Sequence, residues 1–392
     1  MLADREHKRV ALGDVCEFVN GNGFRPPDWS PTGLPIIRIQ NLNGSRSFNH
    51  FNGKPKEKWI VQPGDLLFAW AGVKGVSFGP TIWPGPKGVL NQHIYRIIPQ
   101  GNIDQYWLYL ALQMVTRRVE ANAHGFKSSL VHVHKEDITS QVIDVPPLDE
   151  QHKIAGILRT WDEAIEKLEA LRTSKANQFA GLVQELLGRG GNFPTRWELR
   201  PLTELTNRVR RQNGGGEHPV MTISAKSGFL MQADKFSRDM AGRSVERYTL
   251  LQEGEFAYNK GNSKTAPYGC IFRLDRPTAL VPFVYYCFAL KPGLDPDFYA
   301  HLFAAGALNH QLSRLINSGV RNDGLLNLNV EDFFSCLVPV PPQDEQKRIA
   351  KILSTAKREM ALIDDEIEAM ERQKRGLMQK LLTGEWRVKG EG

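Results

Sequence analysis

Cysteine is scarce in this chain of 392 residues. The four cysteines form no Cys-x-x-Cys pair, and no histidines accompany them at the spacing of a zinc site; they are Cys16, Cys270, Cys287 and Cys336. Scattered thiols of this kind fit a reducing compartment and argue against structural zinc. We therefore expect neither a disulfide framework nor a metal centre in this chain.

Long hydrophobic runs are absent as well. No stretch approaches the roughly 20 apolar residues of a membrane-spanning helix. The polar start MLADREHKR also lacks the apolar core of a signal peptide. We expect a cytoplasmic protein that does not enter a membrane.

The motifs of nucleotide and methyl-donor chemistry are missing too. The sequence has no GxxxxGK[ST] phosphate loop and no G-x-G-x-x-G motif after a strand, and its Pro-Pro pairs are not of the Asn-Pro-Pro-aromatic kind. Asp332, Glu345 and Lys347 imitate the acid pair and lysine of a metal nuclease. However, Glu345 stands where a helix is expected to start, and the positive end of a helix explains an acidic residue there more simply. The pattern indicates a chain that recognises rather than catalyses, without a cofactor of its own.

What the sequence does contain is a long internal repeat. Residues 145–160 read VPPLDEQHKIAGILRT and residues 340–355 read VPPQDEQKRIAKILST, identical at eleven of sixteen positions. The offset of 195 then holds without a gap to Leu187 and Leu382, and weaker matches at offsets of 184 and 190 reach the start of each half. Such a period indicates domain duplication, because the repeats of solenoids and propellers span roughly 20–50 residues.

The repeat predicts four segments. Two divergent globular domains, 1–145 and 191–340, each precede a repeated region with a long helix, 146–190 and 341–392. Both globular domains are expected to be mixed α/β. Short strand patterns bounded by turns stand at 35–40, 65–70 and 93–98 and again at 219–224, 255–259 and 283–290, and helical patterns at 107–119 and 298–316.

The two long helices carry matching heptad seams. Apolar residues recur in a 4-3 alternation from Ile154 to Leu186 and from Ile349 to Leu381, interrupted at Arg172, Lys175 and Lys374. We expect the helices to pack as an antiparallel coiled coil that relates the two halves by a pseudo-two-fold axis. The alternative is a coiled coil that merely dimerises the protein.

The net charge of +7 is unevenly placed. The helical segments 149–187 and 344–382 together hold fourteen Lys/Arg and fifteen Asp/Glu, so the positive excess lies on the globular parts. A basic surface away from the helices predicts a polyanionic partner such as DNA. A generally basic surface without such a partner is the alternative.

Loops between the expected strands hold side chains that suit DNA. Arginine, asparagine and glutamine form bidentate contacts with base edges, and lysine contacts phosphates. The alternative for each residue is an ordinary solvated side chain. The candidates are Arg38, Gln40, Asn41, Asn43, Lys74 and Lys127 in the first half, and Lys226, Lys260, Asn262, Lys264, Arg321 and Asn322 in the second.

The segments PPLDEQHKIAGIL and PPQDEQKRIAKIL each close a variable half and open a long helix. In this arrangement they resemble the repeated regions of the specificity subunits of type I restriction–modification systems. The resemblance implies a target recognition domain in each half, reading one part of a split double-stranded DNA sequence. The coiled coil between them would set the unspecific gap. It also implies a prokaryotic cytoplasmic complex with methyltransferase and restriction/translocase subunits, to which S-adenosylmethionine, ATP and Mg²⁺ would belong.

The repeated helix starts are the expected docking place for two identical methyltransferase subunits. A chain that reads DNA without a cofactor site needs an enzyme, and the most repeated surface suits two copies of one. The candidates are Asp149, Glu150, Gln151, Asp344, Glu345 and Gln346. Two other readings remain open: a coiled-coil scaffold that joins proteins without touching DNA, and a stand-alone nuclease.

Overall fold

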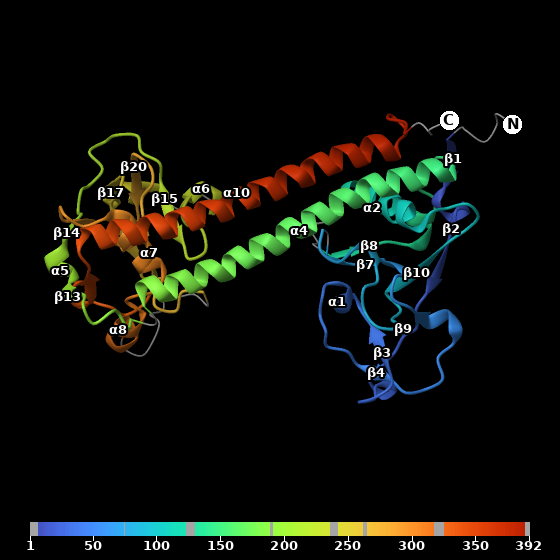
Figure 1. Ribbon diagram of the computed structural model, residues 1–392, viewed down its shortest axis with the longest axis horizontal. Coiled ribbons are helices and arrows are strands. Elements are labelled where there is room, and N and C mark those ends of the chain that lie inside the picture. Colours follow the sequence, from blue (N-terminus) through green and yellow to red (C-terminus); the bar gives the residue numbers. More distant parts are fainter. Residues whose placement is uncertain are drawn as a thin grey trace. The chain divides into compact units, whose positions relative to one another are not determined.

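The computed structural model describes residues 7–73, 75–122, 130–188, 191–235, 242–261, 265–316 and 325–388. The chain divides into two compact units (Figure 1). Unit 1 combines residues 1–169 with 366–392, and unit 2 is the continuous stretch 170–365. Each unit holds one α/β domain and part of both long helices, α4 (Leu148–Leu187) and α10 (Gln343–Leu382).

Unit 1 is built on a four-stranded antiparallel sheet. Its order is β2 (Cys16–Asn20), β10 (Ile94–Pro99), β6 (Leu66–Ala69) and β8 (Gly79–Ile82). Helix α2 (Gln105–Asn122) lies against β8 at Gly79, where an added Cβ would stand 3.0 Å from Cγ2 of Thr116. Trp107, Leu108 and Leu112 of α2 are fully buried in the core of this unit.

Shorter pairings complete unit 1. The first strand of the domain, β1 (Lys8–Ala11), pairs antiparallel with the last, β12 (Val142–Val145). A second sheet has the order β4 (His50–Phe51), β3 (Leu34–Ile37), β9 (Gly88–Leu90), β5 (Ile60–Val61), and β3 and β9 run parallel. The remaining elements are η2 (Leu12–Asp14), η3 (Pro26–Asp28), α1 (Ile39–Leu42), η4 (Glu57–Trp59), β7 (Ala71–Val73), β11 (Leu130–His132) and α3 (Lys135–Thr139).

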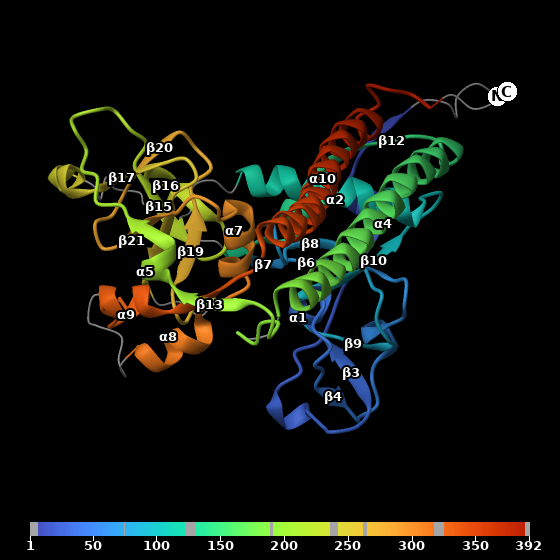
Figure 2. The same cartoon turned by 60° about the vertical axis from the view of Figure 1, so that its left-hand side comes forward.

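Unit 2 repeats the central four-stranded sheet and the pairing of the first and last strands, but has two two-stranded sheets where unit 1 has its second four-stranded sheet; its elements are labelled in Figure 2. Its central sheet has the order β14 (Thr206–Arg208), β21 (Tyr286–Leu290), β18 (Phe256–Asn259), β19 (Cys270–Arg273). Its first and last strands also pair, β13 (Glu198–Pro201) with β22 (Leu337–Val340). The other elements are α5 (Leu202–Leu205), the hairpin β15 (Met221–Ser224) and β16 (Gly228–Met231), α6 (Gln232–Lys235), η5 (Gly242–Arg247), β17 (Thr249–Gln252), β20 (Thr278–Val281), α7 (Pro296–Ala304), α8 (Asn309–Leu315) and α9 (Val330–Ser335).

The mixed α/β class, the six strand patterns and the duplication are confirmed by these elements. One helix was expected over 298–316, and that prediction is wrong. The structure has two helices there, α7 and α8, with Gly306 between them at φ +74°. A left-handed residue ends α7 because its backbone cannot continue a right-handed helix, and glycine adopts that conformation without steric cost.

The long helices run antiparallel in both units. In unit 1, Asp162 of α4 pairs with Lys374 of α10. In unit 2, Arg172 pairs with Asp364 at 3.0 Å and Lys175 with Glu359 at 2.9 Å. Partner numbers fall on α10 as they rise along α4, and the three polar interruptions of the heptad seam are all ion-paired.

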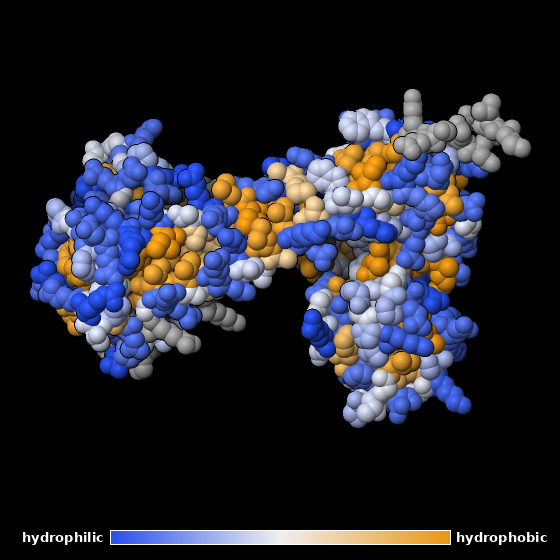
Figure 3. Space-filling model, viewed as in Figure 1, coloured by the Kyte–Doolittle hydropathy of each residue, from blue (hydrophilic) through white to orange (hydrophobic). Residues whose placement is uncertain are grey.

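Apolar residues fill the rest of the seam. Ile154 and Leu158 are buried in unit 1, and their counterparts Ile349 and Leu353 are buried in unit 2. Other apolar side chains of the helices reach the surface, and hydrophobic colour is visible along them in Figure 3. Within the described ranges, no helix combines the length and apolar character needed to cross a bilayer.

Candidate nucleic-acid interface

The loop after β3 is folded by one of its own asparagines. The Oδ1 atom of Asn41 accepts a hydrogen bond from the Arg38 backbone N–H at 2.9 Å. Its Nδ2 donates to the backbone carbonyls of Ser45 at 3.0 Å and Ser47 at 2.9 Å. Asn41 is 5% exposed, so the expected DNA contact by this side chain is corrected to a role in shaping the loop. Gln40 and Asn43, in contrast, are exposed on the same loop.

Arg38 is restrained by an aromatic ring. Its guanidinium carbon lies 4.5 Å from the centroid of the Trp29 ring, and Trp29 is 38% exposed. Stacking holds the planar guanidinium in one orientation and leaves its outer N–H groups as donors. Unit 1 therefore presents a pre-oriented arginine beside the exposed amides of Gln40 and Asn43.

Unit 2 has a comparable pair at another place in its chain. The guanidinium carbon of Arg247 lies 4.7 Å from the centroid of Phe283, which is 51% exposed. Lys226 and Ser227 are exposed in the turn of the β15–β16 hairpin. Sequence reasoning missed Trp29, Arg247 and Phe283. Arg38 stands nine positions after Trp29, and Phe283 stands 36 positions after Arg247, so no constant spacing marks the pairs.

Lys260 is attached to its own domain. Its Nζ donates to the Tyr286 hydroxyl at 3.3 Å and lies 5.2 Å from the centroid of that ring. The side chain is half-buried in this position, so it is less accessible to DNA than Lys226. The remaining candidates lie outside the described residues: Lys74, Lys127, Asn262, Lys264, Arg321 and Asn322.

Basic residues surround both stacked arginines, Arg38 and Arg247, in the sequence. Residues 20–62 hold six Lys/Arg and two Asp/Glu, and residues 206–252 hold eight and four. Each segment therefore carries an excess of four positive charges. The electrostatic field of an excess of positive charge attracts a phosphate backbone and raises the rate at which a protein encounters DNA.

Glu150 is bound within unit 1. Its carboxylate accepts hydrogen bonds from Arg387 Nε at 2.9 Å, Arg387 Nη2 at 2.8 Å and the Val388 backbone N–H at 3.1 Å, and His7 Nε2 lies 3.6 Å away. Burial acts to raise the pKa of Glu150, but the hydrogen bonds from Arg387 and Val388 and the charge of Arg387 outweigh it and lower the pKa. The carboxylate is 6% exposed and offers little surface to a partner subunit.

Glu345 occupies the corresponding position in unit 2. It accepts hydrogen bonds from Arg196 and, at 3.1 Å, from Trp197 Nε1. Burial acts to raise its pKa, and these two bonds and the Arg196 charge lower it overall. Trp197 precedes β13 as His7 precedes β1, at the offset of 190 found in the sequence repeat. In both units, therefore, a glutamate at the start of the long helix contacts the residue just before the first strand of the domain.

Gln151 and Gln346 are each 1% exposed. The Nε2 atom of each donates at 2.8 Å to the first proline carbonyl before its helix, that of Pro146 or Pro341. The expectation that these glutamines contact a partner is corrected. Both are buried and bind the chain just before their own helix, and this shared internal contact accounts for their repetition. Asp149 and Asp344 remain exposed at the same helix starts.

The comparisons with known proteins agree with this architecture. A family model described as the type I restriction modification DNA specificity domain matches residues 5–174 and 279–372. The chain is 24% identical to the type I restriction enzyme MjaVIII specificity subunit of Methanocaldococcus jannaschii, over 97% of this chain and 93% of that protein. It is 25% identical to the EcoBI specificity subunit of Escherichia coli over 41% of this chain and 34% of that protein.

Two solved structures share the fold. The S subunit of the type I restriction–modification system from M. genitalium aligns with a TM-score of 0.57 and 15% identity, covering 97% of this chain and 96% of that one. A chain from a study of complex assembly and conformational transition in the type I R-M system aligns with a TM-score of 0.59 and 15% identity, covering 97% and 98%.

Proposed function

This chain belongs to the family of type I restriction–modification DNA specificity proteins, and we propose that its two domains each read one half of a split double-stranded target. The observation that carries the proposal is one sheet topology built twice with unlike loops. A shared scaffold with different loops suits two related domains that recognise different sequences. The chain itself reads DNA, and methylation and cleavage belong to other subunits.

Each domain would combine two kinds of contact. Lysines and arginines of the basic segments hold the phosphate backbone, which fixes register without reading sequence. Arg38 in unit 1 and Arg247 in unit 2 offer bidentate donors to guanine, and Gln40 and Asn43 suit adenine. The stacked rings lower the entropy that each arginine loses on binding.

Binding to duplex DNA over a salt series tests this proposal against the scaffold alternative. The logarithm of the association constant should fall linearly with the logarithm of salt concentration, with a slope of about −0.9 for each phosphate neutralised. If the purified complex of this protein with its partner subunits binds no DNA duplex at low salt, the proposal that it recognises DNA is refuted. Metal-dependent cleavage by this chain alone would instead favour the nuclease alternative.

The partners follow from the repeated helix starts. Two methyltransferase subunits would dock around the exposed Asp149 and Asp344 and the helix surfaces behind them, and restriction/translocase subunits would join that assembly. S-adenosylmethionine, ATP and Mg²⁺ would be bound by those subunits, in a prokaryotic cytoplasm. Replacing both aspartates by lysine costs about 0.3–1 kcal/mol of helix-dipole energy at each site, so the protein should stay folded. A folded variant that still captures two methyltransferase subunits at normal affinity would place docking elsewhere.

A further inference from the structure

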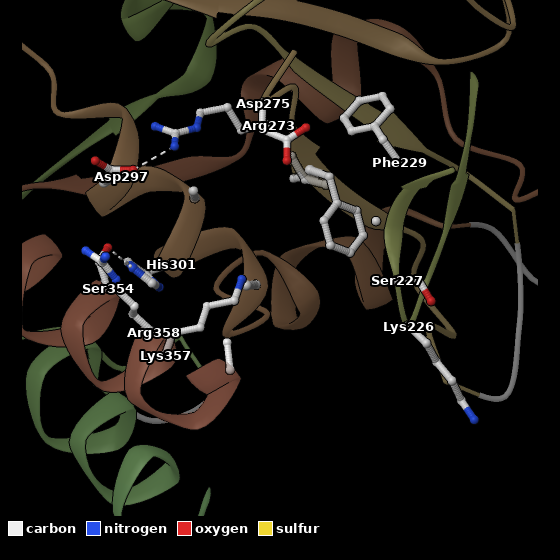
Figure 4. A pocket seen from close by; sticks show the side chains of 16 residues that line it. Lys226, Ser227, Phe229, Arg273, Asp275, Asp297, His301, Ser354, Lys357 and Arg358 are labelled. Atoms are coloured by element: carbon white, nitrogen blue, oxygen red, sulfur yellow. Dashed lines mark hydrogen bonds and ion pairs between the residues drawn. The ribbon is translucent and has the colours of Figure 1, made fainter. Parts of the chain in front are cut away.

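A pocket in unit 2 is not used by the proposed function. It has a volume of about 680 Å³ and lies between the turn of the β15–β16 hairpin, β19, α7 and α10 (Figure 4). This volume is within the range of roughly 300–1,000 Å³ that small-molecule sites occupy. The domain contributes one wall and the long helix α10 the other.

The pocket carries an excess of positive charge. Lys226, Lys357 and Arg358 line it and make no hydrogen bond or ion pair with any described residue. In Figure 4 the side chain of Lys357 extends into the space, while that of Lys226 points away from it at the rim. Cations without a described partner at a concave surface favour an anionic ligand. The ligand can form charge-assisted hydrogen bonds with them in place of water.

Four of the other polar side chains are matched in two pairs, and the carboxylate of Asp275 also lines the pocket. Arg273 pairs with Asp297 at 2.7 Å, and His301 Nε2 lies 2.9 Å from Ser354 Oγ. Burial lowers the pKa of His301, and the charge of Lys357 lowers it further. His301 is therefore a neutral hydrogen-bonding group near pH 7, and Lys357 and Arg358 supply the charge on the α10 side.

Aromatic rings form the opposite side. Phe229 of β16 and Phe272 of β19 line the pocket and are half-buried. Gly228 makes room for this arrangement, since a Cβ there would stand 3.1 Å from Cδ1 of Phe272, and its φ is +69°. Nucleobases of every kind stack on such rings. Rings facing unpaired cations match the two ends of a nucleotide.

Unit 1 reverses this charge. At the offset of 195, Asp162 and Glu163 of α4 take the positions of Lys357 and Arg358. Asp162 is also engaged there, since it pairs with Lys374 and accepts a hydrogen bond from Tyr106 at 2.5 Å. A partner protein that docks in the same way on both repeated helices would meet negative charges on α4 and positive charges on α10. The cations of the pocket are therefore not explained by two copies of one partner.

We propose that this pocket binds a nucleotide, with its phosphate at Lys357 and Arg358 and its base against Phe229 and Phe272. The phosphate and base could belong either to a free nucleotide or to a nucleotide within a bound DNA strand. The free-nucleotide source is independent of DNA reading, whereas the DNA source rests on the proposed function.

Calorimetric titration of ADP into the full-length protein tests the free source. The variant Lys357→Asp/Arg358→Glu installs the residues of the other repeat, and it should weaken ADP binding by about tenfold or more, as loss of two charge-assisted phosphate contacts implies. The control Lys347→Asp/Lys351→Glu makes the same charge change on an exposed part of α10 and should leave binding unchanged. Phe272→Leu should weaken ADP binding while pyrophosphate binding is retained.

Duplex binding over a salt series tests the DNA source. If ADP does not bind, the Lys357→Asp/Arg358→Glu variant should reduce the salt slope by about two, one for each lost phosphate contact. A wild-type chain that binds no duplex refutes the proposed function but leaves the ADP result standing. The pocket proposal is overturned if ADP binding is absent and the variant binds duplex like wild type. Should the double variant unfold, Lys357→Gln and Arg358→Gln carry the same comparisons singly.

Discussion

The amide oxygen of Gln151 accepts a hydrogen bond from the backbone N–H of Asp104 at 2.8 Å, and so ties α4 to the start of α2. Gln346 makes the same bond to Asp295, also at 2.8 Å, and ties α10 to the start of α7. The most conspicuous repeat in the sequence is therefore a joint between a long helix and its domain. Each glutamine is buried, so water cannot replace it.

Truncating either glutamine should destabilise its own unit. Gln151→Ala or Gln346→Ala leaves a half-buried backbone N–H and a buried proline carbonyl without their hydrogen-bond partner, at a cost of about 1–3 kcal/mol. Hydrogen exchange should show the loss in unit 1 for the first variant and in unit 2 for the second. The exposed Gln184 on α4 provides the control, since Gln184→Ala should change neither unit. Equal loss of protection in both units would contradict a local joint.

Arg387→Met should make the stability of unit 1 depend differently on pH. The folded-state pKa of Glu150 lies below its ordinary value of 4.5, so its stabilising contribution is present above that pH and is lost as pH falls through the folded pKa. Without Arg387, the pKa of Glu150 rises relative to wild type, because two of the interactions that lower it are lost while burial still acts to raise it. The variant should lose about 1–3 kcal/mol at neutral pH, and the difference from wild type should shrink as the solution becomes acidic. Denaturant unfolding at several pH values measures it, and a difference independent of pH would disprove the linkage.

Lys374 and Asp162, which form an ion pair between the long helices, should make non-additive contributions to the free energy of unfolding. Lys374 is 14% exposed at its side chain. Lys374→Met leaves Asp162 without its cation and should cost about 1–3 kcal/mol. Lys374→Met/Asp162→Asn should recover part of that loss, because the amide still accepts from Tyr106 and no unpaired charge remains. A double-mutant cycle by urea unfolding measures the coupling; additive effects would show that the two residues act separately.

Arg38 and Arg247 should each affect one half of the DNA target. Lysine keeps the charge but cannot form the planar bidentate contact. Arg38→Lys or Arg247→Lys should therefore lower discrimination at one base pair by about 1–3 kcal/mol, or roughly ten- to hundredfold in affinity. Competition binding with targets altered in one half measures the effect, and Arg372→Lys on α10 is the control. A change in thermal stability without a change in discrimination would assign the stacks to loop structure alone.

Exchange of a whole domain should change one half of the target as well. Replacing residues 1–145 with the equivalent domain of another family member leaves α4, α10 and unit 2 residues in place. Sequencing of methylated sites in a host carrying the chimera should show one new half-sequence and one unchanged. If both halves changed together, the domains would not read DNA independently.

Periodicity predicted much of this fold. The six strand patterns and the long helices follow from local sequence. The helices end shortly before Gly188 and Gly384, which both have positive φ, +82° and +72°. The break at Gly306 was missed because the apolar pattern of 298–316 continues through it. Asn41 was misassigned because a polar loop residue looks the same in sequence whether it faces solvent or folds its own loop. The stacked arginines join residues brought together by tertiary structure, which no spacing rule reports.

The division of unit 1 into two distant segments affects how the chain is made. Unit 2 is continuous, so all of its residues have been synthesised once the ribosome has passed residue 365. Unit 1 begins the chain, yet it lacks Lys374, Met378 and Arg387 until the last segment emerges. Limited proteolysis of chains that end at residue 365 and are held on the ribosome through an added C-terminal linker should find unit 2 protected and unit 1 cleaved. The half of the protein that is translated first is thus the half that is completed last, and an unfinished chain would expose the half-built surface of unit 1 to chaperones and proteases.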